Sequence, residues 1–384
     1  IMAYYQWLCR LSGRHVNIVF LEVIIVYRKK LLYIMGIDWQ WILQRPQVIG
    51  LHLENNYDVT VVFPRSILKW QLVLKGEYPR CFGVLWTLPF QEKNIVLNFL
   101  SCLLARPLFR HIEQYDAIVI GYPLYYRYIP TNYCGKVIYD CMDNYETLYP
   151  YKKGVTHVLT QEKKLVQRCD ALVVSCQKLY WKMAEYANVK STVTRVIRNG
   201  TNINTIIEPH SATKQDGKYR IGYFGTLAEW FDYPLLEKSL SMNKDLEYHL
   251  IGPYIGGTPQ KHSGLIYEGI VPHNQLAQRT KSYACLIMPF FVNDIVEWVD
   301  PVKLYEYIAL GKCIVSVYYD EIERFSDYVY FYRTEDEYIE LMELLKRESF
   351  TPKYTIEQQK EFLYNNSWDV RLKEWDELLH LLGL

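Results

Sequence analysis

The sequence has no excess of charge of either sign. Its 43 lysines and arginines nearly balance its 42 aspartates and glutamates, which leaves a formal net charge of +1 over 384 residues. A chain with so little net charge has no overall field that attracts nucleic acid. Nucleic acid is therefore not an expected partner, and any site for an anion has to be local.

Paired cysteine motifs are also absent. The nine cysteines contain no C-x-x-C pair, most of them lie in apolar runs, and their number is odd. These features exclude a fully paired disulfide framework and disfavour a zinc site. We expect reduced, buried thiols of the kind found in cytosolic proteins.

The most apolar run near the N-terminus does not have the length of a membrane span. Residues 16–27 (VNIVFLEVIIVY) are too few to cross a bilayer, and Glu22 interrupts them. The run also lacks the small-residue cleavage site of a signal peptide. We interpret residues 1–29 as an additional strand or as sequence upstream of the native start, and we expect a cytoplasmic protein.

What the sequence does contain is material for two α/β domains. Half of its residues are hydrophobic, which is enough for two cores in a chain of this length. Short apolar runs alternate with segments of helical periodicity, as in parallel sheets that are covered on both faces. The predicted strands are residues 31–35, 58–63, 117–121, 136–140, 171–175 and 194–197, and then 220–225, 247–252, 265–269, 284–289 and 313–317.

A polar segment divides this pattern into two similar halves. We predict an N-terminal acceptor-binding domain over residues 1–205, a linker over 206–218, a C-terminal domain over 219–362, and a final helix over 363–384 that packs back on the N-terminal domain. The predicted fold is α/β, with two Rossmann-like doubly wound domains facing a cleft. Ligands bind at the carboxyl ends of such strands, so this plan favours an enzyme with two substrates.

The clearest chemical motif is the segment Asp300–Lys312 (DPVKLYEYIALGK). It opens a predicted helix with a proline at the first turn, and Lys303 and Glu306 lie on the same face of that turn. A helix N-terminus and an ammonium together form an anion site, and a carboxylate beside them can accept hydrogen bonds from sugar hydroxyls. This combination suits a nucleoside diphosphate. A surface ion pair worth about 0.2–0.5 kcal/mol explains the spacing equally well.

Several shorter motifs follow one another in a fixed order. They are GIDW at 36–39, QRPQ at 44–47, VIYDCMD at 137–143, CDALVVS at 169–175, VIRNG at 196–200, IGYFGT at 221–226, LIGP at 250–253, MPF at 288–290 and the helix start at 301–311. In this order they resemble family 4 of the retaining glycosyltransferases, which has the GT-B fold. Within it the chain is similar to bacterial teichuronic acid and capsular polysaccharide glycosyltransferases. The resemblance extends from about residue 30 to the end of the chain.

The resemblance implies a hexosyltransferase-type enzyme that moves a sugar from a nucleoside-diphosphate sugar to a hydroxyl of a glycan or lipid-linked acceptor. It implies retention at the anomeric carbon, and we expect no cofactor besides the donor substrate. Glu306 is similar to the family's ribose-binding glutamate and, with Lys303, would be catalytic. The remaining donor-site residues implied are Gly225 and Thr226 at the phosphates, Gly252, Pro253 and Tyr254 near the base, and Asp300 and Pro301 at the helix start. Asn199 and Gly200 would lie at the interdomain hinge.

Two positions depart from the family's pattern. The family's paired glutamates would place one at residue 298, where this chain has Trp298, and residues 227–232 (LAEWFD) contain no base to hold the diphosphate. Lys303 would then carry the phosphate charge with the helix ends alone. These departures leave open a catalytically degenerate scaffold subunit, and a sugar-nucleotide epimerase of the same fold is a second alternative.

The acceptor candidates follow strands of the first half. Asp38, Trp39 and Arg45 come after the first strand, and Asp140 and Asp143 come at the end of a later one. Carboxylates bind sugar hydroxyls and an aromatic face covers apolar C–H groups, although a helix N-cap explains Asp38 equally well. The two later aspartates have no third ligand beside them, so we expect no metal site.

One further segment points to a membrane surface. Residues 94–112 form a very apolar helical pattern that carries Arg106, Arg110 and His111, and Lys152 and Lys153 follow elsewhere in the first half. Such a face can dock on an anionic bilayer, which would place the protein at the inner face of the cell membrane. The favoured interpretation is a core helix with basic ends.

Overall fold

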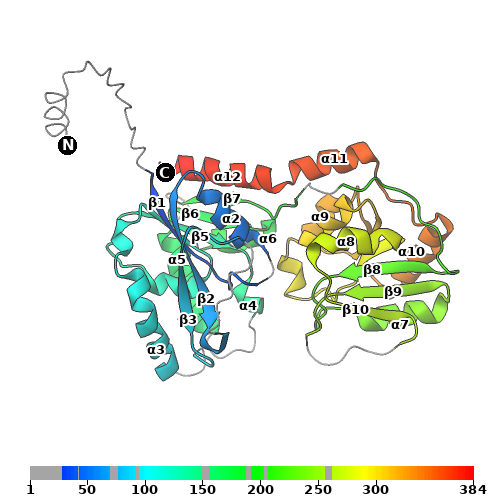
Figure 1. The fold of residues 1–384 in the computed structure, drawn as a ribbon, viewed down its shortest axis with the longest axis horizontal. Helices are drawn as coiled ribbons and strands as arrows, with labels where there is room; N and C mark the ends of the chain where they lie inside the picture. Colours follow the sequence, from blue (N-terminus) through cyan, green and yellow to red (C-terminus); the bar gives the residue numbers. More distant parts are fainter. Residues whose placement is uncertain are drawn as a thin grey trace, which may run out of the picture.

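The computed structural model describes residues 28–41, 43–69, 77–91, 95–148, 155–186, 192–202, 206–255 and 262–384. The predicted extra segment therefore lies almost entirely outside the described residues, as do Lys152 and Lys153. The described chain forms two parallel sheets, each covered by helices on both faces (Figure 1). This confirms the predicted α/β fold of two doubly wound domains.

The N-terminal domain contains a seven-stranded sheet in the order β3-β2-β1-β4-β5-β6-β7. Every neighbouring pair of strands is parallel. The strands are β1 (Lys30–Ile34), β2 (Asp58–Ser66), β3 (Cys81–Thr87), β4 (Ala117–Ile120), β5 (Lys136–Cys141), β6 (Ala171–Val174) and β7 (Val193–Val196). The helices are α2 (Arg45–Leu53), α3 (Ile95–Ala105), α4 (Tyr145–Leu148), α5 (Val155–Arg168) and α6 (Gln177–Ala184).

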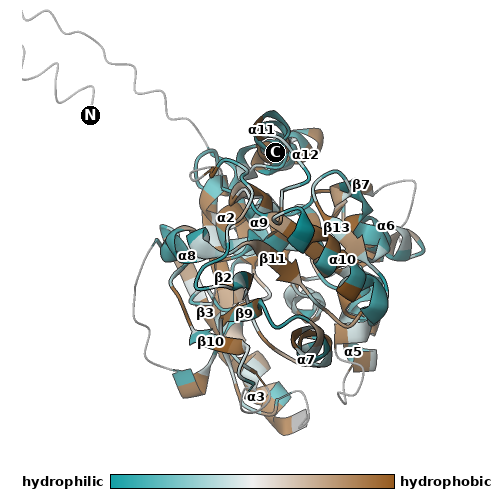
Figure 2. Cartoon of the chain, turned by 90° about the vertical axis from the view of Figure 1, so that its right-hand side faces the viewer, coloured by the Kyte–Doolittle hydropathy of each residue, from teal (hydrophilic) through white to brown (hydrophobic). Residues whose placement is uncertain are grey.

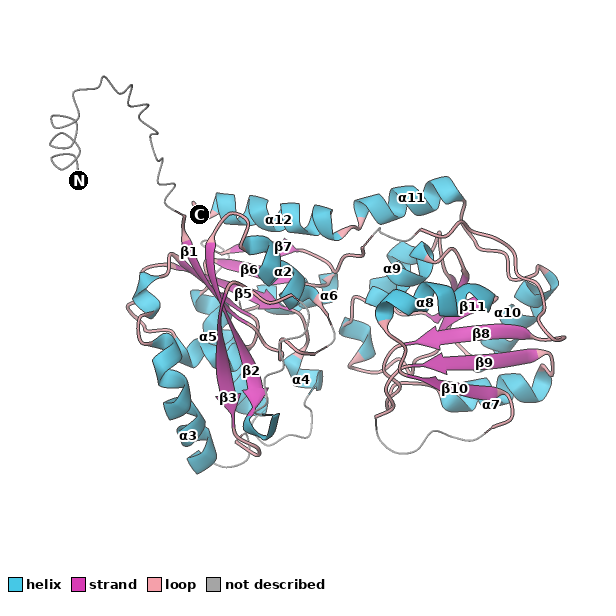
Figure 3. Cartoon of the chain, in the orientation of Figure 1, coloured by secondary structure: helices cyan, strands magenta, loops and turns pink. Residues whose placement is uncertain are grey.

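The C-terminal domain contains a six-stranded parallel sheet in the order β10-β9-β8-β11-β12-β13. Its strands are β8 (Tyr219–Phe224), β9 (Leu246–Ile251), β10 (Leu265–Gly269), β11 (Cys285–Met288), β12 (Cys313–Val317) and β13 (Tyr330–Tyr332). Its helices are α7 (Tyr233–Met242), α8 (His273–Arg279), α9 (Val302–Ala309), α10 (Glu335–Arg347) and α11 (Ile356–Asn365), and α12 (Trp368–Leu381) follows them (Figure 3).

The central strands of both sheets are continuous apolar runs because both of their faces are covered. All residues of β4, β6, β11 and β12 are buried. Side chains of successive residues point to opposite faces and feed a separate apolar cluster on each side of each sheet. The carboxyl ends of the strands are thus the places where polar residues and glycines can leave the core.

The chain crosses between the domains twice, and the two crossings lie side by side. Trp368 donates its backbone N–H to the carbonyl of Thr201 at 3.1 Å, and Thr201 donates its own to Asn366 at 3.0 Å. A Cβ on Gly200 would lie 2.9 Å from the backbone nitrogen of Trp368, so only glycine permits this approach. Beyond the crossing, α12 runs along the N-terminal domain, where the fully buried Trp375 joins the cluster beside β1 (Figure 1).

No helix among the described residues combines the length and the apolar character needed to traverse a bilayer.

Candidate functional site

The candidate site begins where β8 ends and the chain turns at Gly225. This glycine has φ 141°, a conformation that side-chain-bearing residues rarely adopt. A Cβ added to it would lie only 2.2 Å from Cε of Lys303, which comes from the first turn of α9. The absent side chain at Gly225 therefore lets the lysine lie directly over the turn. The structure brings together these two residues, which the sequence separates widely.

Lys303 is a cation that makes no direct ion pair with any described residue. Its ammonium lies 5.8 Å from the ring centroids of both Tyr223 and Phe290, and it forms no hydrogen bond or ion pair with the described part of the chain. Burial lowers its pKa, and the nearby Glu306 carboxylate acts in the opposite direction. A desolvated cation is costly unless an anion or hydrogen-bond acceptors surround it. The three donors of this ammonium are thus available to a ligand.

Of the two backbone N–H groups at the same turn, that of Gly225 is hydrogen-bonded within the sheet and that of Thr226 has no acceptor among the described residues. The Gly225 N–H donates to the carbonyl of Ile251 at 2.9 Å, so it is already used in joining β8 to β9. This corrects the expectation that Gly225 offers its N–H to a phosphate. The N–H of Thr226 has no acceptor among the described residues. At the start of α9, the N–H of Leu304 donates to the carbonyl of Pro301 at 3.1 Å, and the N–H groups of Val302 and Lys303 have no acceptor among the described residues.

A second glycine turn at the end of β9 lies against the first. Gly252 has φ 135°, and a Cβ there would lie 2.0 Å from the carbonyl oxygen of Gly225. The next carbonyl, that of Pro253, accepts the N–H of Leu227 at 2.9 Å. Tyr254 then turns its ring toward two other tyrosines, at centroid distances of 6.1 Å. The carboxyl ends of β8 and β9 and the start of α9 thus meet at one place.

Glu306 lies one turn beyond Lys303 on α9 and is paired with a histidine that the sequence did not single out. Its carboxylate accepts a hydrogen bond from Nε2 of His273 at 2.8 Å. The side chain of His273 is 75% exposed and that of Glu306 is 25% exposed, so both reach solvent. The hydrogen bond to Glu306 raises the pKa of His273. The signal that could have revealed His273 is its place: α8 begins at the same sheet edge as α9.

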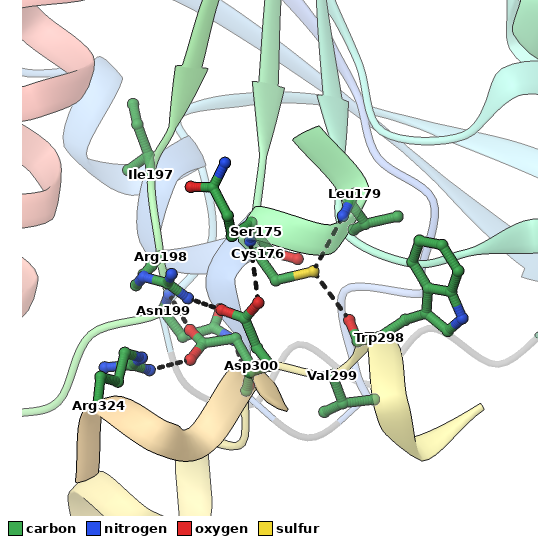
Figure 4. Close-up of polar contacts among 12 residues, drawn as sticks. Ser175, Cys176, Leu179, Ile197, Arg198, Asn199, Trp298, Val299, Asp300 and Arg324 are labelled. Atoms are coloured by element: carbon green, nitrogen blue, oxygen red, sulfur yellow. Dashed lines mark hydrogen bonds and ion pairs between the residues drawn. The ribbon is translucent and has the colours of Figure 1, made fainter. Parts of the chain in front are cut away.

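Asp300 holds the interdomain hinge and has no free surface for a donor. It is 3% exposed and accepts the backbone N–H of Asn199 at 2.7 Å (Figure 4). It also accepts the hydroxyl of Tyr305 at 3.0 Å and pairs with the Arg324 guanidinium. This burial corrects the expectation that the Asp300 carboxylate binds a donor. Pro301 beside it is also buried and forms the N-cap of α9.

The aromatic acceptor candidate lies in the core. Trp39 is 7% exposed, packs on Phe63 at a centroid distance of 6.2 Å, and donates its indole N–H to the carbonyl of Glu77 at 3.0 Å. Asp38 forms an ion pair with Arg65 at 3.0 Å. Trp39 therefore has no open face for a sugar, which corrects that expectation, and the partly exposed Asp38 is engaged by a cation.

Of the other acceptor candidates, Arg45 and Asp140 are buried and paired with each other, and Asp143 is half-buried. Arg45 and Asp140 form an ion pair at 2.9 Å with side chains 2% and 0% exposed, and Arg45 also donates to the carbonyl of Ile197 at 2.6 Å. These two residues join α2, β5 and the segment after β7, which corrects their assignment to an acceptor. Asp143 is half-buried, and burial raises its pKa to about 6. A role for Asp143 at the acceptor stays a prediction.

Trp298, which stands where the resembled family has a glutamate, docks on the N-terminal domain. Its ring lies 4.8 Å from the ammonium of Lys178 and 5.6 Å from that of Lys182. Its carbonyl accepts the thiol of Cys176 at 3.2 Å (Figure 4). In the same region Arg198 pairs with Glu321. Trp298 therefore contributes to the contact between the domains.

Two further observations delimit the site. No group of three or more His, Cys, Asp or Glu side chains within the described ranges is arranged to hold a metal ion. A surface hollow of about 450 Å³ lies along α11 and α12, apart from Lys303 and Glu306, and is lined by Tyr364, Ser367, Asp369, Val370, Lys373, Glu374 and Glu377.

Comparison with known proteins gives matches at the level of structure. No protein-family model matches the sequence, and no curated protein matches it. A sucrose-phosphate synthase from Thermosynechococcus elongatus aligns with a TM-score of 0.70 at 12% identity, over 93% of this chain and 99% of that one. Anabaena HepE in complex with UDP-glucose aligns with a TM-score of 0.64 at 11% identity, over 91% and 99%. The lipopolysaccharide outer core galactosyltransferase WaaB aligns with a TM-score of 0.61 at 12% identity, over 91% and 99%. At these identities the likeness establishes the fold, and the chain has the two-domain α/β architecture of the GT-B proteins.

Proposed function

We propose that this chain transfers a glycosyl group from a nucleoside-diphosphate sugar to a hydroxyl group of an acceptor. The observation that carries the proposal is the Lys303 ammonium, which lies over the Gly225 turn and makes no direct ion pair or hydrogen bond with the described residues. A diphosphate has the charge and the acceptor oxygens that this cation requires. The fold adds support, because the structurally similar HepE of Anabaena was determined with UDP-glucose bound.

The donor would lie across the carboxyl ends of β8 and β9. Its phosphates would accept hydrogen bonds from the Lys303 ammonium, from the Thr226 N–H and from the backbone N–H groups of Val302 and Lys303 at the start of α9. Glu306, one turn further along α9, would accept hydrogen bonds from the ribose hydroxyls. Its pairing with the exposed His273 leaves the second carboxylate oxygen for that purpose. The base would lie near Gly252, Pro253 and Tyr254.

The reaction would form a bond between the acceptor oxygen and the anomeric carbon while the bond from that carbon to the diphosphate oxygen breaks. Negative charge develops on the departing diphosphate, and a fixed ammonium in a partly dry site stabilises that charge. The acceptor proton would pass to the departing phosphate, so the reaction would need no protein nucleophile. We further propose retention at the anomeric carbon, no metal ion, and an acceptor that is a glycan or a lipid-linked sugar of the cell surface.

A scaffold role in polysaccharide assembly is the second candidate. It is favoured by Trp298, which packs against the N-terminal domain where the resembled family has a carboxylate, and by the missing bases in residues 227–232. A scaffold would bind its partners without turning over a donor. Donor turnover therefore separates the two functions.

The test is calorimetric titration and thermal unfolding with UDP, GDP, dTDP and their glucose and galactose derivatives. A ligand that binds the folded state raises the melting temperature by mass action. We expect binding in the wild type and a roughly 10- to 100-fold loss in Lys303→Met and in Glu306→Gln, because each removes a charged hydrogen-bonding group. Lys360→Met, an exposed lysine on α11, is the matched control. Unaltered binding in Lys303→Met would remove the assignment, and binding without hydrolysis or transfer would favour the scaffold.

A further inference from the structure

The outer face of α3 exposes a stripe of large apolar side chains. Val96, Phe99, Leu100 and Leu104 are 61%, 60%, 43% and 50% exposed. Residues three and four positions apart on a helix share a face, so these four side chains form one continuous strip. The helix lies at the outer edge of the N-terminal domain, on the side away from the C-terminal domain (Figure 1).

The polar residues of α3 point inward instead. Ser101 is 4% exposed, and its hydroxyl oxygen accepts the N–H of Leu88 at 3.3 Å. The Asn98 side chain accepts the guanidinium of Arg127 at 2.8 Å. An ordinary surface helix shows the opposite arrangement, with its polar face in water. The expectation of a core helix is therefore wrong for the outer face of α3, whose apolar strip is exposed, whereas Ala105, Phe109 and Ile112 of the same segment join the core. Figure 2 shows the ribbon of α3 at the lower edge of the molecule, coloured largely as hydrophobic.

Two arginines that are unpaired among the described residues lie beside this strip, and the first acidic residue after it, Glu113, lies 3.7 Å from His111. All 11 residues of α3 are uncharged, and the segment 106–112 that follows contains two arginines and a histidine but no acidic residue. Arg106 and Arg110 are exposed, and neither forms an ion pair or a side-chain hydrogen bond with the described residues. An apolar strip beside free guanidinium groups complements a surface that is apolar beneath a layer of negative charge.

We propose that this docking face, formed by α3 and residues 106–111, binds the surface of an anionic lipid bilayer. The apolar side chains enter the boundary between headgroups and acyl chains, while Arg106 and Arg110 contact lipid phosphates. Self-association through the same face is disfavoured, because two copies would bring their arginines together. Docking would keep the protein at the membrane surface, where lipid-linked acceptors are found. This inference uses none of the residues of the proposed donor site.

The test is co-sedimentation of the full chain with vesicles of phosphatidylglycerol and phosphatidylcholine, compared with vesicles of phosphatidylcholine alone. We expect Arg106→Gln/Arg110→Gln to bind the anionic vesicles roughly 30-fold more weakly, because each base near such a surface contributes about a fivefold factor. Phe99→Ser/Leu104→Ser should lose roughly 100-fold or more through two buried apolar side chains. Ile270→Ser is the matched control, because Ile270 is 75% exposed on the other domain.

Three outcomes would overturn the proposal. They are unchanged vesicle binding by Phe99→Ser/Leu104→Ser, equal binding of the wild type to neutral and anionic vesicles, and self-association that the same variant abolishes in the absence of vesicle binding. Unchanged melting temperatures would show that the variants fold. Titration with UDP is expected to give wild-type affinity in every variant, so failure of the docking face is distinct from failure of the donor site.

Discussion

Asn199 and Asp300 bind each other twice across the boundary between the domains. The backbone N–H of Asn199 donates to the Asp300 carboxylate at 2.7 Å, and its side-chain amide donates to the Asp300 carbonyl at 2.9 Å (Figure 4). Asp300 immediately precedes the start of α9, which carries Lys303 and Glu306. One buried carboxylate therefore fixes both the hinge and the position of the proposed donor helix.

We expect Asp300→Asn to lower the free energy of unfolding by about 3 kcal/mol. The substitution removes the charge that compensates the Arg324 guanidinium, and breaking a buried ion pair on one side is costly. Chemical unfolding in urea would measure the loss. Asp336→Asn is the control, since that carboxylate is 86% exposed and should give no measurable change. A stability equal to that of the wild type would contradict the role of Asp300 at the hinge.

Gly225→Ala should displace Lys303 and weaken the binding of a nucleoside diphosphate roughly tenfold or more. The new Cβ would meet Lys303 at 2.2 Å and would also impose a strained φ of 141°. Gly217→Ala separates the collision with Lys303 from the backbone strain, because Gly217 also has a positive φ, 79°, but has open space around it. Titration calorimetry should show lost affinity in the first variant alone. Equal affinities would disconnect the turn from the site.

Lys303→Met should raise the melting temperature of the free protein while weakening diphosphate binding roughly 10- to 100-fold. The lowered pKa of Lys303 means that its charged form is disfavoured by folding. Burial of Lys303 therefore lowers the free energy of unfolding by its full amount at pH values below the lowered pKa. This loss becomes smaller as pH rises from the lowered pKa toward the pKa of an unfolded lysine. Thermal unfolding at neutral pH, with and without UDP, measures both effects. A lower melting temperature in the variant would show that the ammonium is already compensated.

The ion pair of His273 and Glu306 should make a small, pH-dependent contribution to stability. The hydrogen bond between the two side chains raises the pKa of His273. The stabilisation from this pair is therefore complete below the pKa of an unfolded histidine and is lost as pH rises through the raised pKa. The effect is small because the histidine is mostly exposed. Melting curves of the wild type and His273→Gln should differ at low pH and converge at high pH. Parallel curves would contradict this pairing.

The alternation of apolar strands and helices made both sheets predictable from the sequence, because burial on two faces leaves a continuous hydrophobic run. The edge strands β3 and β13 were missed, because β3 has only one buried residue and β13 is only three residues long. The helix predicted over 94–112 ends earlier, and Pro107 lies in a separate short turn of 3₁₀-helix over Arg106–Phe109.

The candidate site was predictable only where local chain geometry determines it. Lys303 and Glu306 follow from their spacing on one helix, and Gly225 and Gly252 from their places after strands. Asp140 is paired with Arg45, 95 residues away in the sequence, and no local pattern distinguishes such an aspartate from one that faces a ligand. Likewise, periodicity places the apolar residues of α3 on one face but does not say which way that face is turned.

The paired crossing of the chain between the domains restricts how they can move. Two adjacent segments, joined by the hydrogen bonds between Thr201, Asn366 and Trp368, leave bending about their common line as the easy motion. A single connection would also allow one domain to swivel about the other. Opening and closing should therefore follow one path, and every closure would return the β8–β9 edge to the same place opposite the N-terminal sheet.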